Sequence, residues 1–455
     1  MLQRQRKPAG DKAIGLVLLC LSLAILAQPI AAQPKYTVHD LGTLGGSFTI
    51  SVATGLSTSG QVVGVSYAPG GETGRAFRTA SNTAINPATD DLGSLGGVYS
   101  SASGINASGQ VVGYSLTGTG TPHAFRTAPN SPINPATNDL GTLGGTQSLA
   151  TGINASGQVV GQAIIANSTE LHGFRTAANS PINPATDDLS MLIQDSQFYG
   201  SFALGINSSG QVVGGFSAPS TSNATHAFRT AANSPINPAT DDLGSLGGGF
   251  SFASGINASG QVVGYSLTGN GTYHAFRTAS NAAINPATDD LGSLGGGFSY
   301  AAGINASGQV VGDTTTGAFV YVGGVMYDLN NLIPVGSGWT LDSGKAINDA
   351  GQIVGQGSYN GQPHAFRLDP LSPANFIAEL LDAINSFNLP QGITTDLSSL
   401  LRSCLDAVER GNNDAARNQL RSFENKVNAL RGKNLTDSQA DTLFGLAAAA
   451  IQLLS

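Results

Sequence analysis

Hydrophobic residues follow two different patterns along the chain, and the change lies near Pro370. Before it, short apolar runs are separated by glycine, asparagine and serine, as in the segment from Gly152 to Gly161. Short runs bounded by turn-forming residues are typical of strands. After it, glycine becomes rare and apolar residues recur every three or four positions, which is typical of amphipathic helices. The pattern predicts a long β region followed by a small helical region.

The β region consists of a repeated unit with three signatures in fixed order: Asp-Leu-Gly, Gly-Ile-Asn-Ala-Ser-Gly-Gln-Val-Val-Gly and His-Ala-Phe-Arg. The second signature begins at seven places, the last a variant: Gly55, Gly104, Gly152, Gly205, Gly255, Gly303 and Ala346. A period of about 48 residues fits a four-stranded propeller blade and is too long for a β-helix coil. The sequence therefore predicts a mainly β fold, a seven-bladed β-propeller over residues 33–369.

Each unit divides into four predicted strands. Strand a runs into Gly-Ile-Asn, and Asn-Ala-Ser-Gly makes a tight turn. Strand b is Gln-Val-Val-Gly, strand c is His-Ala-Phe-Arg, and strand d contains Asp-Leu-Gly. The repeat region begins with a strand-d signature at residues 36–44 and ends with a strand c at His364 to Leu368. If these first and last strands did not pair, both would leave unpaired sheet edges. We therefore expect the first strand to pair antiparallel with the last, with Arg367 across from Asp40.

Residues 370–455 predict four short helices that pack as a bundle. Ser372 before Pro373 has the pattern of a helix start, and Thr436 with Gln439 predicts a capping box. Gly411 and Gly432 are expected at helix ends. Cys404 lies on an apolar stripe, so we expect it in the core.

Composition and charge restrict the location and the partners. The first 32 residues combine four basic residues with an apolar run from Ile14 to Ala27 and small residues at Ala31 and Ala32. This pattern predicts a secretory signal peptide over residues 1–32, with an uncleaved anchor as the alternative. The formal net charge is −8, and loss of the basic leader makes the mature chain more acidic. An acidic surface disfavours nucleic acid and anionic lipid as partners. Cys404 is then the only cysteine, so no intramolecular disulfide can form.

The repeated His-Ala-Phe, Asp-Leu-Gly-Thr-Leu-Gly-Gly and Gly-Ile-Asn-x-x-Gly-Gln-Val-Val-Gly motifs resemble the extracellular HAF-repeat family. The resemblance covers about residues 36–368 and implies an extracellular protein, but that family has no common activity to carry over. Two units depart from the pattern. The sixth has Gly317-Ala318-Phe319-Val320, without His and Arg, and the fourth replaces Leu-Gly-Gly with residues 191–199.

The helical region resembles the FIMAH domain, a small helical module at the ends of secreted bacterial proteins. The residues that carry the resemblance are Ala415, Ala416, Leu420, Phe423 and the run from Val427 through Gly432 and Lys433. The resemblance implies an accessory or attachment module and brings no catalytic residues.

Several repeated polar residues could suggest chemistry. Five histidines open strand c: His123, His172, His226, His274 and His364. A propeller would spread them around a ring, so we expect structural roles. We expect the arginines of strand c to form cross-strand ion pairs with the aspartates of strand d. The acid pairs Asp90-Asp91, Asp187-Asp188, Asp241-Asp242 and Asp289-Asp290 could hold calcium. Without a complete calcium loop, however, we interpret them as solvated turn residues and expect no cofactor.

Aromatic residues gather before Gly-Ile-Asn, at the start of strand a. Those chosen as candidate ligand contacts are Tyr99, Phe250, Phe298, Tyr300 and Trp339. They would lie near the mouth of the channel and could stack on sugars. Packing between neighbouring units is the alternative explanation.

The sequence contains no Gly-x-Ser-x-Gly elbow, phosphate-binding loop, Cys-x-x-Cys or His-Glu-x-x-His motif. The prediction is a secreted, non-catalytic repeat protein that binds or scaffolds at the bacterial cell surface or matrix, with a ligand such as a polysaccharide. The alternative is a glycan-active propeller enzyme, a lyase or glycosidase, which needs two carboxylates within about 5–10 Å. The first places to look for that chemistry are residues that break the repeat: Asp195, Asp313, Asp342 and Lys345.

Overall fold

The structure is a computed structural model that describes residues 35–191, 200–217 and 224–454. The predicted signal peptide over residues 1–32 lies outside the described residues, as does Asp195. No helix in the described part of the chain is both long and apolar enough to span a membrane.

The β region is built from small, mostly antiparallel sheets, in which most neighbouring strands are consecutive in the chain. One parallel contact, between Gly74 and Tyr99, joins two of these units. The strands that run into the Gly-Ile-Asn signature are β2 (Ile50–Leu56), β5 (Gly96–Ile105), β8 (Gly144–Ile153), β11 (Gly200–Ile206), β14 (Gly247–Ile256), β17 (Ser299–Ile304) and β21 (Trp339–Ile347). Their partners after the tight turn are β3 (Val62–Tyr67), β6 (Val111–Thr117), β9 (Val159–Ile165), β12 (Val212–Ser217), β15 (Val262–Thr268), β18 (Val310–Thr314) and β22 (Ile353–Tyr359). The third strands are β4 (Gly74–Arg78), β7 (Pro122–Arg126), β10 (Leu171–Arg175), β13 (Thr225–Arg229), β16 (Tyr273–Arg277), β19 (Gly317–Val322) and β23 (Gln362–Pro370).

The fourth strand is shorter than predicted in most units. It is a full strand in two sheets, as β20 (Val325–Asp328) beside β19 and as β1 (Tyr36–Asp40) beside β23. In the other five units it is a single bridge, such as Phe125 to Asp139. The reason lies in the segment before the aspartate, which in these units is a tight turn and not a strand: the Asn134 amide donates to the Asn138 side chain at 2.7 Å. In one unit the preceding segment also forms a short helix, α1 (Pro238–Asp241).

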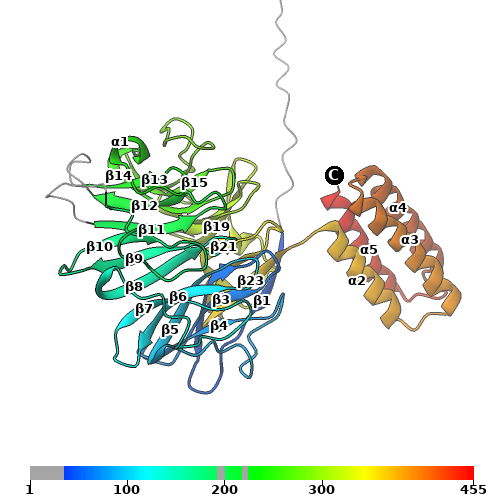
Figure 1. Ribbon diagram of the computed structural model, residues 1–455. Helices are drawn as coiled ribbons and strands as arrows, with labels where there is room; N and C mark the ends of the chain where they lie inside the picture. The colour runs from blue at the N-terminus through cyan, green and yellow to red at the C-terminus, as the bar shows by residue number, and fades with distance from the viewer. Residues whose placement is uncertain (1–34, 192–199, 218–223, 455) are drawn as a thin grey trace, which may run out of the picture. The chain divides into compact units, whose positions relative to one another are not determined.

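The first strand pairs antiparallel with the last, as the sequence predicted. Tyr36 lies opposite Pro370 and Asp40 opposite Phe366, and Figure 1 shows β1 beside β23. The predicted partner of Asp40 was wrong, because Asp40 contacts His364 while Arg367 binds Asp369 through two hydrogen bonds of 2.9 Å. The β region therefore joins its two ends in one sheet.

Adjacent units share their hydrophobic cores. One core combines Val213 and Ala227 of one unit with Phe276 of the next, and another combines Phe77 of the first unit with Val354 of the last. The phenylalanine of each His-Ala-Phe signature is fully buried. Since each core contains residues of two neighbours, no unit can bury its apolar surface alone.

Asparagine side chains also link the units in sequence. The Nδ2 groups of six turn asparagines each donate to the backbone carbonyl at the same position of the next unit, at 3.1–3.2 Å: Asn106, Asn154, Asn207, Asn257, Asn305 and Asn348. The last of these reaches Ser57, so the chain of hydrogen bonds returns from the last unit to the first.

The helical region contains α2 (Pro373–Ser386), α3 (Gln391–Glu409), α4 (Asn413–Leu430) and α5 (Asp437–Leu453), and Figure 1 shows these four helices. Their apolar faces form one core, which includes Cys404 as predicted. The Ser372 cap and the Thr436 capping box are confirmed. Gly411 and Gly432 follow helix ends with φ values of 68° and 71°.

Candidate functional site

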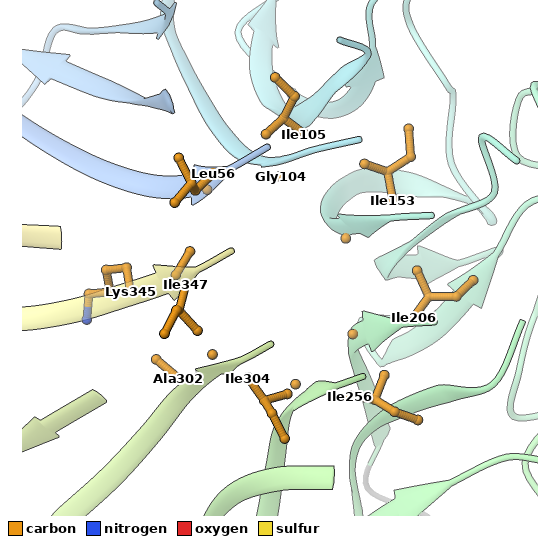
Figure 2. A pocket seen from close by; sticks show the side chains of 16 residues that line it. Leu56, Gly104, Ile105, Ile153, Ile206, Ile256, Ala302, Ile304, Lys345 and Ile347 are labelled. Carbon is orange, nitrogen blue, oxygen red and sulfur yellow. The ribbon is translucent and has the colours of Figure 1, made fainter. Parts of the chain in front are cut away.

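The inner strands of all the units converge on one pocket, whose lining side chains are mostly apolar. Figure 2 shows it lined by Leu56 and by the isoleucine of each following Gly-Ile signature, up to Ile347. Lys345 is the only charged residue in the lining. In Figure 2 its side chain points away from the ring of isoleucines. Apart from Lys345, the polar surface of the pocket therefore comes from the backbone and not from side chains.

The histidines of strand c bind the aspartates of the outer segment. In each pair the Nδ1 atom lies 2.9 Å from a carboxylate oxygen: His123–Asp139, His172–Asp188, His226–Asp242, His274–Asp290 and His364–Asp40. Each pair joins the third strand of a sheet to its edge. The histidines therefore have the expected structural role. Their partners are the strand-d aspartates, for which the sequence predicted arginine partners.

Apart from Arg367, the arginines of strand c bind backbone carbonyls of the next unit and not the aspartates of their own unit. The Arg126 guanidinium donates to the Ser180 carbonyl at 3.0 Å, and that of Arg229 donates to the Ala282 carbonyl at 2.8 Å. Burial lowers the pKa of both guanidinium groups. The predicted Arg–Asp cross-strand pairs are wrong, since these arginines link adjacent units through backbone carbonyls.

The hydrogen bond to Asp242 raises the pKa of His226 above 6.5, and burial opposes this shift only in part. A raised histidine pKa stabilises the fold fully below the unfolded value, and the contribution is lost as pH rises through the folded value. We expect Asp242→Asn to lower the pKa of His226, measured by NMR titration of the imidazole signals. Asp241→Asn is the matched control, because Asp241 binds Asn237 and Thr240 instead. An unchanged His226 titration in Asp242→Asn would contradict this assignment.

The acid pairs are structural. The first acid of each pair is buried: its carboxylate accepts the backbone amide four residues earlier and the preceding threonine hydroxyl, as for Asp90 with Asn86 and Thr89. The second acid is the histidine partner. The interpretation as solvated turn residues is therefore wrong for the first acid. Among the described residues, no group of three or more His, Cys, Asp or Glu residues could hold a metal ion.

Three of the five candidate aromatics belong to one cluster. Phe298 stacks on Tyr300 at a centroid distance of 4.8 Å, and Tyr300 meets Tyr265 of the preceding unit edge-on at 4.7 Å. Phe250 contacts Tyr265 at 5.9 Å and Tyr273 at 5.6 Å. Phe252 extends the cluster by stacking on Tyr265 at 5.8 Å. We call these six residues, Phe250, Phe252, Tyr265, Tyr273, Phe298 and Tyr300, the aromatic platform.

Most of the platform lies toward the end of the sheets opposite the Asn-Ala-Ser-Gly turns, near the starts of strands a and c, while Phe252 and Tyr265 face each other in the middle of β14 and β15. Phe298 is 38% exposed. Burial is the main cause that raises the pKa of Tyr265 and Tyr300. Both hydroxyls therefore stay protonated at neutral pH and can donate or accept hydrogen bonds.

The other two candidates lie in separate contacts. Tyr99 packs between Tyr67 and Tyr114, and its hydroxyl lies within 3.4 Å of both of their hydroxyls. Trp339 stacks on Tyr359 at 5.2 Å. The structure thus groups Phe250, Phe298 and Tyr300 and leaves Tyr99 and Trp339 outside that group.

Tyr265 and Tyr273 were missed in the sequence. A signal was present, because Tyr265 follows Gly-Gln-Val-Val-Gly where other units have Val65, Gln162 or Gly215. Only the strand register, which sets Tyr265 opposite Phe252, brings it to the platform.

The residues that break the repeat are partly brought together. The Lys345 Nζ atom lies 3.3 Å from Asp313 Oδ2. Asp342 is exposed, and partial burial of its carboxyl raises its pKa. Among the three of these residues that the structure describes, the contact is therefore an acid with a lysine, and not the two facing carboxylates that a glycosidase would use.

Comparison with known proteins finds structural similarity but no matching family. No family model matches the chain, and no curated protein matches it. Among solved structures, the chain is similar to the WD40 domain of coronin from Toxoplasma gondii, at 10% sequence identity and a TM-score of 0.35. That match covers 74% of this chain and 85% of the other. A TM-score this low supports no conclusion about function, so the fold rests on the strand pairing of the chain itself: a mainly β protein of several small sheets with a helical region at its C-terminal end.

Proposed function

We propose that this chain is a secreted, non-catalytic binding protein of the bacterial cell surface or matrix, and that its ligand is a polysaccharide. The observation that carries the proposal is the aromatic platform. Sugar-binding surfaces need flat apolar faces beside hydrogen-bonding groups, and aromatic rings with hydroxyls supply both. The platform spans two adjacent units and includes an exposed ring, Phe298.

The proposal includes the architecture that positions the platform. We propose that the β region is a seven-bladed β-propeller of HAF repeats, with residues 370–455 as a FIMAH-like attachment module. The support is the seven inner strands that line one pocket, the asparagine hydrogen bonds that return from Asn348 to Ser57, and the pairing of β1 with β23. In a propeller, loops at one end of the sheets share one face, so a ligand at the platform would contact several units.

A glycan array with the chain from residue 33 onward tests the proposal, with soluble β-glucan, mannan and alginate as follow-up ligands. We expect Phe298→Ala and Tyr300→Ala each to weaken binding at least about tenfold, because a stacked aromatic anchor contributes well over 1 kcal/mol. Val325→Ala is the matched control, since it also removes an exposed apolar side chain, 47% exposed, but on an outer strand. Failure of the wild-type chain to bind any array glycan, or equal losses in all three variants, would overturn the proposal.

A further inference from the structure

A polar cluster replaces the aromatic contacts at one edge of the platform. Strand pairing shows which residues are equivalent in successive units. Tyr265 lies opposite Phe252 in one unit, and Asp313 lies opposite Tyr300 in the next. Asp313 is therefore the equivalent of Tyr265. Ser343 takes the corresponding place of Tyr300 in the last unit, opposite Gln356. Tyr265 and Tyr300 are in contact between two adjacent units. At the equivalent positions of the next pair of units, the residues are an acid, Asp313, and a hydroxyl residue, Ser343.

Lys345 completes the cluster from an irregular strand. The register of β21 shifts between Leu341 and Ser343 and again between Gly344 and Ala346. The shifts leave Asp342 and Lys345 without cross-strand partners. The second shift recurs in the other inner strands, where the extra residue is uncharged, as with Ser254. Bulges redirect side chains, and here the long side chain reaches Asp313 at 3.3 Å.

Two polar atoms of this cluster have no hydrogen-bond partner among the described residues: Asp313 Oδ1 and Ser343 Oγ, both buried. Leaving such atoms unpaired costs roughly 1–3 kcal/mol each, so a purely structural role does not explain why they are there. The Asp313 and Lys345 side chains keep 28% and 35% of their surface exposed, which leaves the pair open to solvent on one side. Rotation of the carboxyl group about its broad terminal torsion can present Oδ1 to that side.

We propose that Asp313, Ser343 and Lys345 form a polar subsite that binds two adjacent hydroxyl groups of a neutral sugar ring stacked on Tyr300. The inference rests on the proposed function and names the part of the site that orients the sugar. The carboxylate accepts a hydrogen bond from one hydroxyl, and the ammonium group donates one of its free N–H bonds to the next. Ser343 Oγ gains the partner that it lacks in the protein.

The charge balance of the cluster favours a neutral sugar over an acidic one. Lys345 is already paired with Asp313, so the subsite carries no surplus positive charge for a uronate carboxylate. An Asp–Lys pair instead offers an acceptor and a donor side by side, which matches the alternating needs of two neighbouring hydroxyls.

The test compares the wild-type chain with single variants by isothermal titration against soluble β-glucan and mannan, with alginate as the acidic probe. We expect Asp313→Asn and Lys345→Met each to weaken binding of a neutral polysaccharide at least fivefold, and alginate to bind more weakly than the neutral polymers. We expect Ser343→Ala to weaken binding while its melting temperature stays equal or rises, because no hydrogen bond within the protein is lost. Ser251→Ala is the matched control: Ser251 Oγ binds Gly244 and Ala227, so that variant should lose stability and keep its affinity.

The outcomes separate the two proposals. Neutral-glycan binding that is lost in Tyr300→Ala but unchanged in Asp313→Asn and Lys345→Met overturns the subsite and leaves the platform standing. Preference for alginate overturns the neutral-sugar assignment. Absence of binding to every glycan overturns both proposals. A destabilised Ser343→Ala shows that its hydroxyl has a structural partner and also contradicts the subsite.

Discussion

Removal of residues 33–45 should destabilise the whole β region. The deletion takes away β1 and with it all five cross-strand pairs to β23. It also removes Tyr36, Leu41 and Leu44, which are 3%, 0% and 8% exposed. At roughly 1.5–3 kcal/mol for each buried side chain, the loss is of the order of 5 kcal/mol. We expect the melting temperature to fall by about 10 °C or more, measured by calorimetry.

Rescue in trans is the control for this deletion. A synthetic peptide of residues 33–45 should restore much of the lost stability, because it can add a strand to the free edge of β23. A scrambled peptide of the same composition should not. A truncated chain that melts at the wild-type temperature would falsify the view that β1 joins the two ends of the β region.

Substitution of Gly264 by alanine should be at least as damaging. A Cβ atom on Gly264 would lie 1.9 Å from the Phe252 carbonyl oxygen, which is backbone and cannot move aside. The same glycine of Gly-Gln-Val-Val-Gly in the other units has equally little space, between 1.7 and 2.0 Å. Overpacking commonly costs about 1–3 kcal/mol, and a backbone clash belongs at or above the upper end. We expect Gly264→Ala to lose cooperative unfolding or to be recovered mainly as insoluble protein.

Gly269→Ala is the matched control for that substitution. Gly269 lies in the turn after the same strand, and no atom lies within 4 Å of its added Cβ. Its melting temperature should stay within about 2 °C of the wild type, since surface substitutions change stability little. If Gly264→Ala behaved like Gly269→Ala, the close approach of strands a and b would be wrong.

The sequence predicted the inner three strands of each unit because their signatures repeat with little change. The length of the fourth strand could not be predicted in the same way. The aspartate binds the amide two residues later both at the end of the full strand β1, where it is Asp40, and at the single bridge of Asp139. The segment before it differs, since in the bridged units that segment is a turn with a hydrogen bond such as that from the Asn134 amide to the Asn138 side chain. Local capping of this kind competes with strand pairing, and the motif Asp-Leu-Gly is compatible with both.

The partners of the repeated charges depended on register, which the repeat alone does not define. Asp139 lies opposite Phe125, so its side chain leaves the same face of the sheet as that of His123, two residues before Phe125. Arg126, one residue after Phe125, points to the other face, toward the next unit. A shift of one residue would reverse these partners. The same limit hid Tyr265 and Asp313, whose neighbours across the strands were unknown.

The pairing of β1 with β23 also has a consequence for how the chain folds. His364 and Asp40 are separated by 324 positions along the sequence, so this contact closes a loop that contains every unit between them. Contacts of such long range slow folding. Until they form, β23 presents an unpaired edge. During that interval the β1 strand of a second molecule offers the same residues as the chain's own, so closure within one molecule competes with strand exchange between molecules, and dilution favours the former.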